Sequence, residues 1–209
     1  MGNIKSCSTE CEYYFEGSGS CCRTMPPSVV NKGGICLFEK GQKYYKYQKA
    51  NERKSITKDL SERVEKYINP RNDPRIYWAR EVTLDYGRES QCRVDYMVFK
   101  PVTNSVSGIE KGDFYCYEVK SSVEDFHSKN GHNMIGDYNY YVMPEEVYNE
   151  IKSELPYRVG IYVPDPINGI KCIKKAKRQD REYPLAVLLL MMFRSANRDR
   201  MKRETNNET

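Results

Sequence analysis

Three charged residues stand in segments that otherwise read as buried β-strands. Asp95 interrupts the alternating run RVDYMVF, and Glu118 and Lys120 lie two positions apart in CYEVKSS. Because side chains alternate along a strand, Glu118 and Lys120 share one face, and Val119 points to the other. Charged side chains are rarely buried unless they are paired or bind a metal. Their placement therefore indicates a functional site.

A hairpin formed by these two strands would bring Asp95 and Glu118 together at one end of a sheet. Two adjacent carboxylates repel each other unless a cation lies between them. A ligand set made of oxygen atoms suits Mg²⁺ or Mn²⁺. Lys120 would then position a water molecule or stabilise the charge that develops on a phosphate. A buried salt bridge is the alternative, but it leaves one carboxylate without a partner.

The same residues resemble the motif of the PD-(D/E)XK nuclease superfamily. Asp95 is followed by Glu118-x-Lys120 on the next strand, and a helix and strand meander precede them as in that core. Downstream, EVKSSVEDF, GDYNYYVMPEEV and RVGIYVPD are similar to the branch that contains the MmcB-like DNA-repair proteins and their phage relatives. The similarity covers about residues 54–203. Val94 stands where the motif has proline.

The resemblance implies a restriction-endonuclease-like fold and a role for each residue of the site. Asp95, Glu118 and the Val119 carbonyl would hold Mg²⁺ or Mn²⁺. Lys120 would orient the attacking water or the scissile phosphate. Glu81, on the preceding strand, would complete the catalytic group.

Glu62, on the upstream helix, is a second candidate for the metal shell, although SERVEKY also reads as a solvated helix face. The implied activity is hydrolysis of nucleic-acid phosphodiester bonds, with DNA as the expected substrate, in repair, recombination or phage DNA metabolism. The alternative is a catalytically inactive nucleic-acid-binding or adaptor module on the same fold.

Polar and basic residues near the motif and in the last helix are candidate nucleic-acid contacts. The serines after Lys120 would bind a phosphate or cap the following helix. The basic residues of the last helix would contact the phosphate backbone or simply form a solvated helix end. The predicted contacts are Ser121, Ser122, Arg194, Arg198 and Lys202.

Periodicity and turn signals predict the elements that position these residues. Residues 55–68 have the spacing of an amphipathic helix, with Ile56, Leu60, Val64, Tyr67 and Ile68 on one face. A final helix is expected from about residue 184 to 204. Strand-like runs lie at 75–87, 91–99, 112–120, 138–144, 158–164 and 169–177. Their alternation with helices predicts an α/β fold, a mixed β-sheet flanked by helices.

Five of the eight cysteines lie in the first 36 residues, in a loop-like segment rich in Gly, Ser and Pro. Such a segment cannot bury enough apolar surface to fold alone, whereas four thiolates around a metal would stabilise it. Zinc is the expected metal, with an iron–sulfur cluster, unpaired thiols or disulfides as alternatives. Four of five residues would bind it, with the adjacent pair competing for one place: Cys7, Cys11, Cys21, Cys22 and Cys36.

These features divide the 209-residue chain into four parts. We expect a cysteine-rich metal-binding segment at 1–40, a linker at 41–53, the nuclease-like domain at 54–204 and a disordered tail at 205–209. The chain shows no secretory signal, and PLAVLLLMMF is too short to span a membrane. The net charge of +5 suits a phosphate-bearing partner. A cytoplasmic protein is expected, and a homodimer is one alternative for its assembly.

Overall fold

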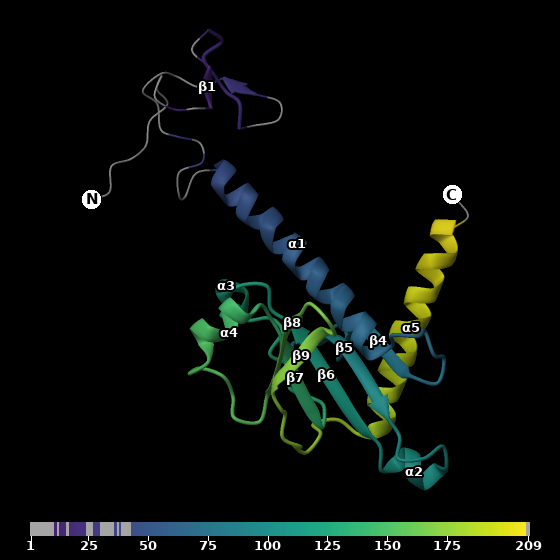
Figure 1. The fold of residues 1–209 in the computed structure, drawn as a ribbon. Coiled ribbons are helices and arrows are strands. Elements are labelled where there is room, and N and C mark those ends of the chain that lie inside the picture. Colours follow the sequence, from purple (N-terminus) through teal and green to yellow (C-terminus); the bar gives the residue numbers. More distant parts are fainter. Residues whose placement is uncertain are drawn as a thin grey trace. The chain divides into compact units, whose positions relative to one another are not determined.

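A computed structural model of the chain describes residues 11, 13–15, 17–23, 27–29, 36, 38 and 43–207 (Figure 1). The chain divides into two compact units, residues 1–54 and 55–209. In the first unit, three short strands pair antiparallel in the order β1-β2-β3 among the described residues. They are β1 (Tyr14–Phe15), β2 (Ser20–Cys21) and β3 (Ser28–Val29).

The second unit contains a six-stranded mixed sheet in the order β4-β5-β6-β7-β8-β9, within the part of the chain that the structure describes. Its first three strands pair antiparallel, β6, β7 and β8 pair parallel, and β9 returns antiparallel. The strands are β4 (Tyr77–Leu84), β5 (Cys92–Lys100), β6 (Asp113–Val119), β7 (Tyr138–Val142), β8 (Gly160–Asp165) and β9 (Gly169–Lys174). The predicted mixed sheet flanked by helices is confirmed.

Helices lie on both sides of this sheet. The helices are α1 (Lys43–Ile68), α2 (Val106–Glu110), α3 (Val123–Phe126), α4 (Glu145–Ile151) and α5 (Leu185–Asn207). The short α2 was not expected, and it lies in the connection between β5 and β6. None of the described helices is long and apolar enough to cross a membrane.

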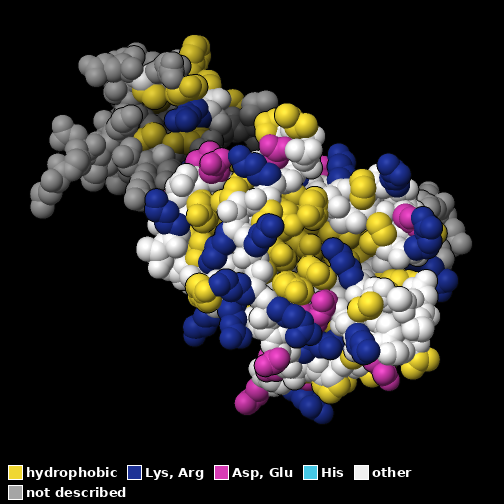
Figure 2. Space-filling model, turned by 60° about the horizontal axis from the view of Figure 1, so that its bottom comes forward, with side chains coloured by type: hydrophobic (Ala, Val, Ile, Leu, Met, Phe, Trp, Pro, Cys, Tyr) yellow, Lys and Arg dark blue, Asp and Glu magenta, His cyan; other side chains and the backbone are white. Residues whose placement is uncertain are grey.

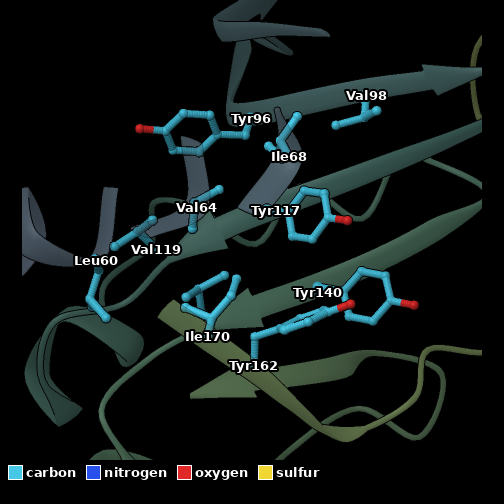
Figure 3. Packing of buried hydrophobic residues seen from close by; sticks show 11 residues of the cluster. Leu60, Val64, Ile68, Tyr96, Val98, Tyr117, Val119, Tyr140, Tyr162 and Ile170 are labelled. Atoms are coloured by element: carbon cyan, nitrogen blue, oxygen red, sulfur yellow. The ribbon is translucent and has the colours of Figure 1, made fainter. Parts of the chain in front are cut away.

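The C-terminal half of α1 covers one face of the sheet with residues spaced by four. Leu60, Val64 and Ile68 pack on Tyr117 and Ile170 in a cluster that includes several tyrosines (Figure 3). Residues four apart lie above one another on a helix, so this spacing produces one apolar stripe. The sequence also placed Ile56 and Tyr67 on that face, but they are 37% and 42% exposed.

The opposite face packs on α5 and on the shorter helices. Leu188 and Met192 of α5 lie against strands β4, β5 and β6, in a cluster that includes Val82 and Val94. A third cluster joins α3 and α4 to β7 and β8 through Phe126 and other apolar residues. Strands β5 and β6, which carry the predicted carboxylates, therefore lie between two packed layers.

The division at residues 54 and 55 lies at the predicted start of the second domain, while the expected linker and tail contain helix. The expected linker at 41–53 is helical from Lys43 onward, because α1 contains no Gly or Pro that would end it, although its first half is polar on every side. The tail expected at 205–209 is helical as far as Asn207, where α5 ends. Residues 208 and 209, and the predicted zinc ligand Cys7, lie outside the described residues.

Candidate active site

β4 and β5 share a kink at Glu81 and Asp95. Ala79 and Val82 both pack toward α5, although regular alternation would put residues three positions apart on opposite faces. The change of face occurs at Glu81, whose φ of 53° is in the left-handed region that a residue with a Cβ rarely adopts. Asp95 lies opposite, between the paired residues Val94 and Tyr96. The kink brings both acidic residues to one place.

Asp95 and Glu118 meet across β5 and β6. The main-chain N–H of Val119 donates to Asp95 Oδ2 at 2.9 Å, which fixes the Asp95 carboxyl group beside β6. Glu118 is only 2% exposed. Its Oε1 is buried and has no hydrogen-bond partner among the described residues. A buried acceptor without a donor is unfavourable, and a bound cation would satisfy it.

The electrostatics of this pair also fit a cation. Burial and the neighbouring Asp95 charge raise the pKa of Glu118 to about 9. Burial raises the pKa of Asp95 as well, and the Glu81 charge adds to this, while the hydrogen bond from Val119 opposes it. Glu118 therefore holds a proton near neutral pH, and a divalent cation would displace it.

Lys120 is buried next to this pair. It is 2% exposed, and burial lowers its pKa. Its Nζ donates to the main-chain carbonyls of Asp125 at 3.2 Å and Asn130 at 2.6 Å. The ammonium group is thus held by α3 and the loop that follows it, and it lies within electrostatic reach of Glu118 and Asp95.

Gly131 closes the site from this loop, and no feature of the sequence singles it out. Its φ is 68°, and a Cβ there would lie 3.0 Å from Lys120 Nζ and 3.2 Å from Glu118 Oε2. The Asn-Gly pair signals a turn, but only the fold places that turn over Lys120. His132, the next residue, is tied by Nδ1 to the Tyr141 hydroxyl at 2.6 Å and so anchors the loop.

Glu81 reaches the site but is drawn outward. Its carboxylate pairs with Arg93 at 2.7 Å, and its side chain is 44% exposed. Glu62 is not brought to the site, because it is exposed on α1, 4.0 Å from Lys58. Glu65, on the next turn of α1, pairs with Arg80 at 3.3 Å.

The serines after Lys120 begin α3. Ser121 donates to Asp125 Oδ2 through its main-chain N–H at 2.8 Å. The Ser122 hydroxyl accepts from the Asp125 N–H at 3.2 Å, so it is the N-cap of the helix. Nucleic-acid contact by either serine remains a prediction.

Replacing the Ser122 cap tests which role dominates. Ser122→Ala is expected to lower the free energy of unfolding by about 1 kcal/mol, because one N–H of the first turn loses its acceptor. Urea denaturation measures this, and Ser128→Ala is the matched control, because it removes a partly buried hydrogen bond to the Asp125 carbonyl but no helix cap. Unchanged stability together with weaker nucleic-acid binding would instead assign Ser122 to a phosphate.

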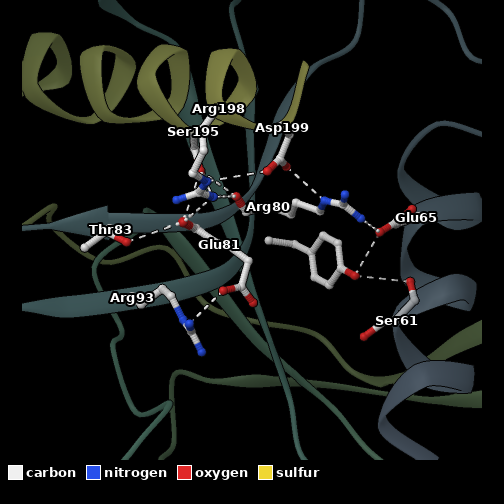
Figure 4. A network of polar contacts seen from close by, with 10 residues as sticks. Ser61, Glu65, Arg80, Glu81, Thr83, Arg93, Ser195, Arg198 and Asp199 are labelled. Carbon is white, nitrogen blue, oxygen red and sulfur yellow. Dashed lines mark hydrogen bonds and ion pairs between the residues drawn. The ribbon is translucent and has the colours of Figure 1, made fainter. Parts of the chain in front are cut away.

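The three basic candidates on α5 differ in their surroundings. Arg194 and Lys202 are exposed. Arg198 is half-buried, and its guanidinium donates to the main-chain carbonyls of Arg80 at 3.3 Å and Glu81 at 3.1 Å (Figure 4). Its Nη2 is therefore directed at the protein backbone, and its Nε is buried without a hydrogen-bond partner among the described residues. Arg194 and Lys202 are instead exposed to an external phosphate.

The structure describes four of the five N-terminal cysteines: Cys11, Cys21, Cys22 and Cys36. Cys21 is buried and Cys22 is exposed. Among the residues that the structure describes, no three His, Cys, Asp or Glu side chains form a group that could hold a metal. The zinc site, which also involves Cys7, stays a prediction.

Comparison with known proteins shows that this chain shares its fold with a solved structure. No protein-family model and no curated protein matches the chain. The solved structure of SPO1766, a protein of unknown function from Silicibacter pomeroyi, is similar with a TM-score of 0.51 and 20% sequence identity. The similarity covers 73% of this chain and 93% of that one. At this identity the likeness shows the fold alone.

Proposed function

We propose that the chain is a metal-dependent nuclease of the restriction-endonuclease-like class that hydrolyses nucleic-acid phosphodiester bonds, most simply those of DNA. The observation that carries this proposal is the buried Glu118 Oε1 without a hydrogen-bond partner, beside the carboxyl group of Asp95. A salt bridge with Lys120 would remove this deficiency, but the Lys120 ammonium donates to two main-chain carbonyls. A cation held by both carboxyl groups would satisfy the Glu118 oxygen and compensate the charge of the pair.

Asp95, Glu118 and the Val119 carbonyl would hold Mg²⁺ or Mn²⁺ in this proposal. Such an ion supplies a water of lowered pKa and stabilises the charge on the phosphate. The water would give up a proton as its oxygen attacks phosphorus, the bond to the leaving strand oxygen would break, and that oxygen would take up a proton. Lys120, fixed by the carbonyls of Asp125 and Asn130, would orient the water or the phosphate.

The protein surface supports a polyanionic partner. Lys and Arg side chains surround an apolar area on the face shown in Figure 2, and the chain has a net charge of +5. Surface cations of this kind attract nucleic acid through its phosphates without reading its sequence. The same basic surface would serve the second candidate, a nucleic-acid-binding module without catalysis. The ion pair of Glu81 with Arg93 favours this second candidate, because it engages a carboxylate that the catalytic group would use.

A cleavage panel separates the two candidates. The wild type is expected to cut at least one of single-stranded, duplex and branched DNA or RNA with Mg²⁺ or Mn²⁺, and to be inactive with EDTA. Asp95→Asn keeps the shape of the side chain and an acceptor for the Val119 N–H, so it serves as the matched inactive control. If the wild type cuts none of these substrates with either metal, the enzyme proposal is wrong and the binding module remains.

A further inference from the structure

Two side chains of α5 converge on the kink of β4. Ser195 Oγ donates toward the main-chain carbonyls of Arg80 at 2.6 Å and Glu81 at 3.0 Å. The Arg198 guanidinium donates to the same two carbonyls at 3.3 and 3.1 Å and to Ser195 Oγ at 2.7 Å (Figure 4). Ser195 is 3% exposed and Arg198 is half-buried, so this contact is largely shielded from solvent. We call Ser195 and Arg198 the α5 clamp.

The clamp acts on strained backbone. Glu81 has a φ of 53°, a conformation that is unfavourable for any residue with a Cβ and that persists only where the surroundings hold it. The kink also turns two consecutive carbonyls away from regular strand positions, and buried carbonyls need donors. Ser195 and Arg198 are one helical turn apart, which places both donors on the face of α5 that meets β4.

Neighbouring ion pairs hold the same region. Arg80 pairs with Asp199 of α5 at 2.9 Å and with Glu65 of α1 at 3.3 Å. Arg198 is 3.5 Å from Asp199. Helices on both faces of the sheet thus fix the residue that precedes Glu81, and the kink is held by contacts from distant parts of the chain.

We propose that Ser195 and Arg198 are positioning residues, which hold Glu81 in its left-handed conformation and so keep its carboxylate beside Asp95. Without the clamp, a β-region φ at Glu81 would restore regular alternation and turn the side chain away from Asp95. The catalytic consequence rests on the proposed nuclease function, whereas the hold on the backbone does not. Arg198 then contributes to the site through Glu81 and makes no contact with a phosphate.

The hold on the backbone is tested by a thermal-stability comparison that needs neither metal nor substrate. In the intact clamp, Glu81→Gly is expected to melt about 2–4 °C above Glu81→Ala, because glycine adopts a positive φ without strain. Both variants lose the carboxylate, so their difference reports the backbone. With Ser195→Ala and Arg198→Ala added, the difference should disappear or reverse, since glycine is unfavourable in a relaxed strand.

An equal Gly–Ala difference with and without the clamp would overturn the proposal. If the doubly substituted background does not fold, Arg198→Ala alone gives the same comparison with part of the clamp removed. Because these outcomes involve no cleavage, the clamp can be confirmed or refuted in a protein that turns out to have no nuclease activity.

Kinetics test the consequence for the site in a protein that cleaves. Arg198→Ala is expected to lower kcat about 10- to 100-fold with little change in KM, as for residues that orient a functional group. Arg194→Ala, the exposed arginine one turn earlier, should instead raise KM and reduce the salt dependence of binding by about one phosphate contact. In a Glu81→Gln background, Arg198→Ala should have no further effect on kcat. A rise in KM with a lower salt slope for Arg198→Ala would make it a phosphate contact and overturn its positioning role.

Discussion

Glu118→Gln is expected to abolish metal-dependent cleavage and, without metal, to make the protein more stable at alkaline pH. The activity should fall at least about 1000-fold, because the metal loses a charged ligand and several kcal/mol of transition-state stabilisation go with it. The gain in stability and the loss of activity have the same cause, which is the loss of the negative charge of Glu118. Glu118 is buried beside another carboxyl group with no cation in place, and the amide of Gln never ionises.

The sign of the pH dependence follows from the raised pKa. The pKa of Glu118 is about 9 in the folded protein, because of burial and the charge of Asp95, against an ordinary value of 4.5. The protonated carboxyl group therefore contributes stability that is fully present below pH 4.5 and is lost as the pH rises toward 9. Each pH unit in this window removes up to about 1.4 kcal/mol.

Urea unfolding in EDTA from pH 5 to 9 measures this slope. Glu118→Gln should flatten it and be more stable than the wild type by about 2–4 kcal/mol at pH 8. Glu62→Gln is the matched control, since Glu62 is exposed on α1 near Lys58. Adding Mn²⁺ should then reverse the order, because the ion stabilises only the protein that binds it. A wild type and a Glu118→Gln variant that respond equally to Mn²⁺ would contradict the assignment of Glu118 as a ligand.

The sequence predicted the members of the central group because their types conflict with their surroundings. Asp95, Glu118 and Lys120 interrupt apolar alternation, and this conflict is visible without coordinates. The sheet was predictable for the same reason, since strands with period two and short turns leave few arrangements. Register then followed from the hairpin, and the structure places Asp95 beside the strand that carries Glu118.

The kink at Glu81 could not be predicted. AREVTL reads as a continuous strand, and nothing in Glu favours a positive φ. The conformation depends on Ser195 and Arg198, more than 110 positions away. Arg198 was therefore predicted to bind phosphate, because a basic helix end usually faces solvent. The role of Gly131 could not be predicted for a related reason. The sequence shows that Gly131 lies in a turn, but it does not show that the turn lies over Lys120.

Lys120→Met is expected to reduce cleavage by about 100- to 1000-fold while the protein still binds Mn²⁺. In the folded protein the Lys120 ammonium donates to carbonyls of Asp125 and Asn130, so it is no metal ligand. Its positive charge opposes a cation at the adjacent carboxyl groups, and its removal should leave Mn²⁺ affinity unchanged or higher. The chemical step suffers, because one preorganised donor typically accounts for about 100- to 1000-fold in rate.

The free energy of unfolding of Lys120→Met shows whether this variant loses activity in the reaction step or because its fold is damaged. Methionine fills much of the same volume, but two carbonyls lose their donor, which costs on the order of 1–3 kcal/mol. Lys129→Met, one residue before Asn130 in the same loop, is the matched control for a change of charge. Calorimetric titration with Mn²⁺ at pH 8 and single-turnover cleavage then give separate readouts. If Lys120→Met stays folded and loses Mn²⁺ binding together with cleavage, Lys120 holds the carboxyl groups in place, and the water or phosphate must be oriented by another residue.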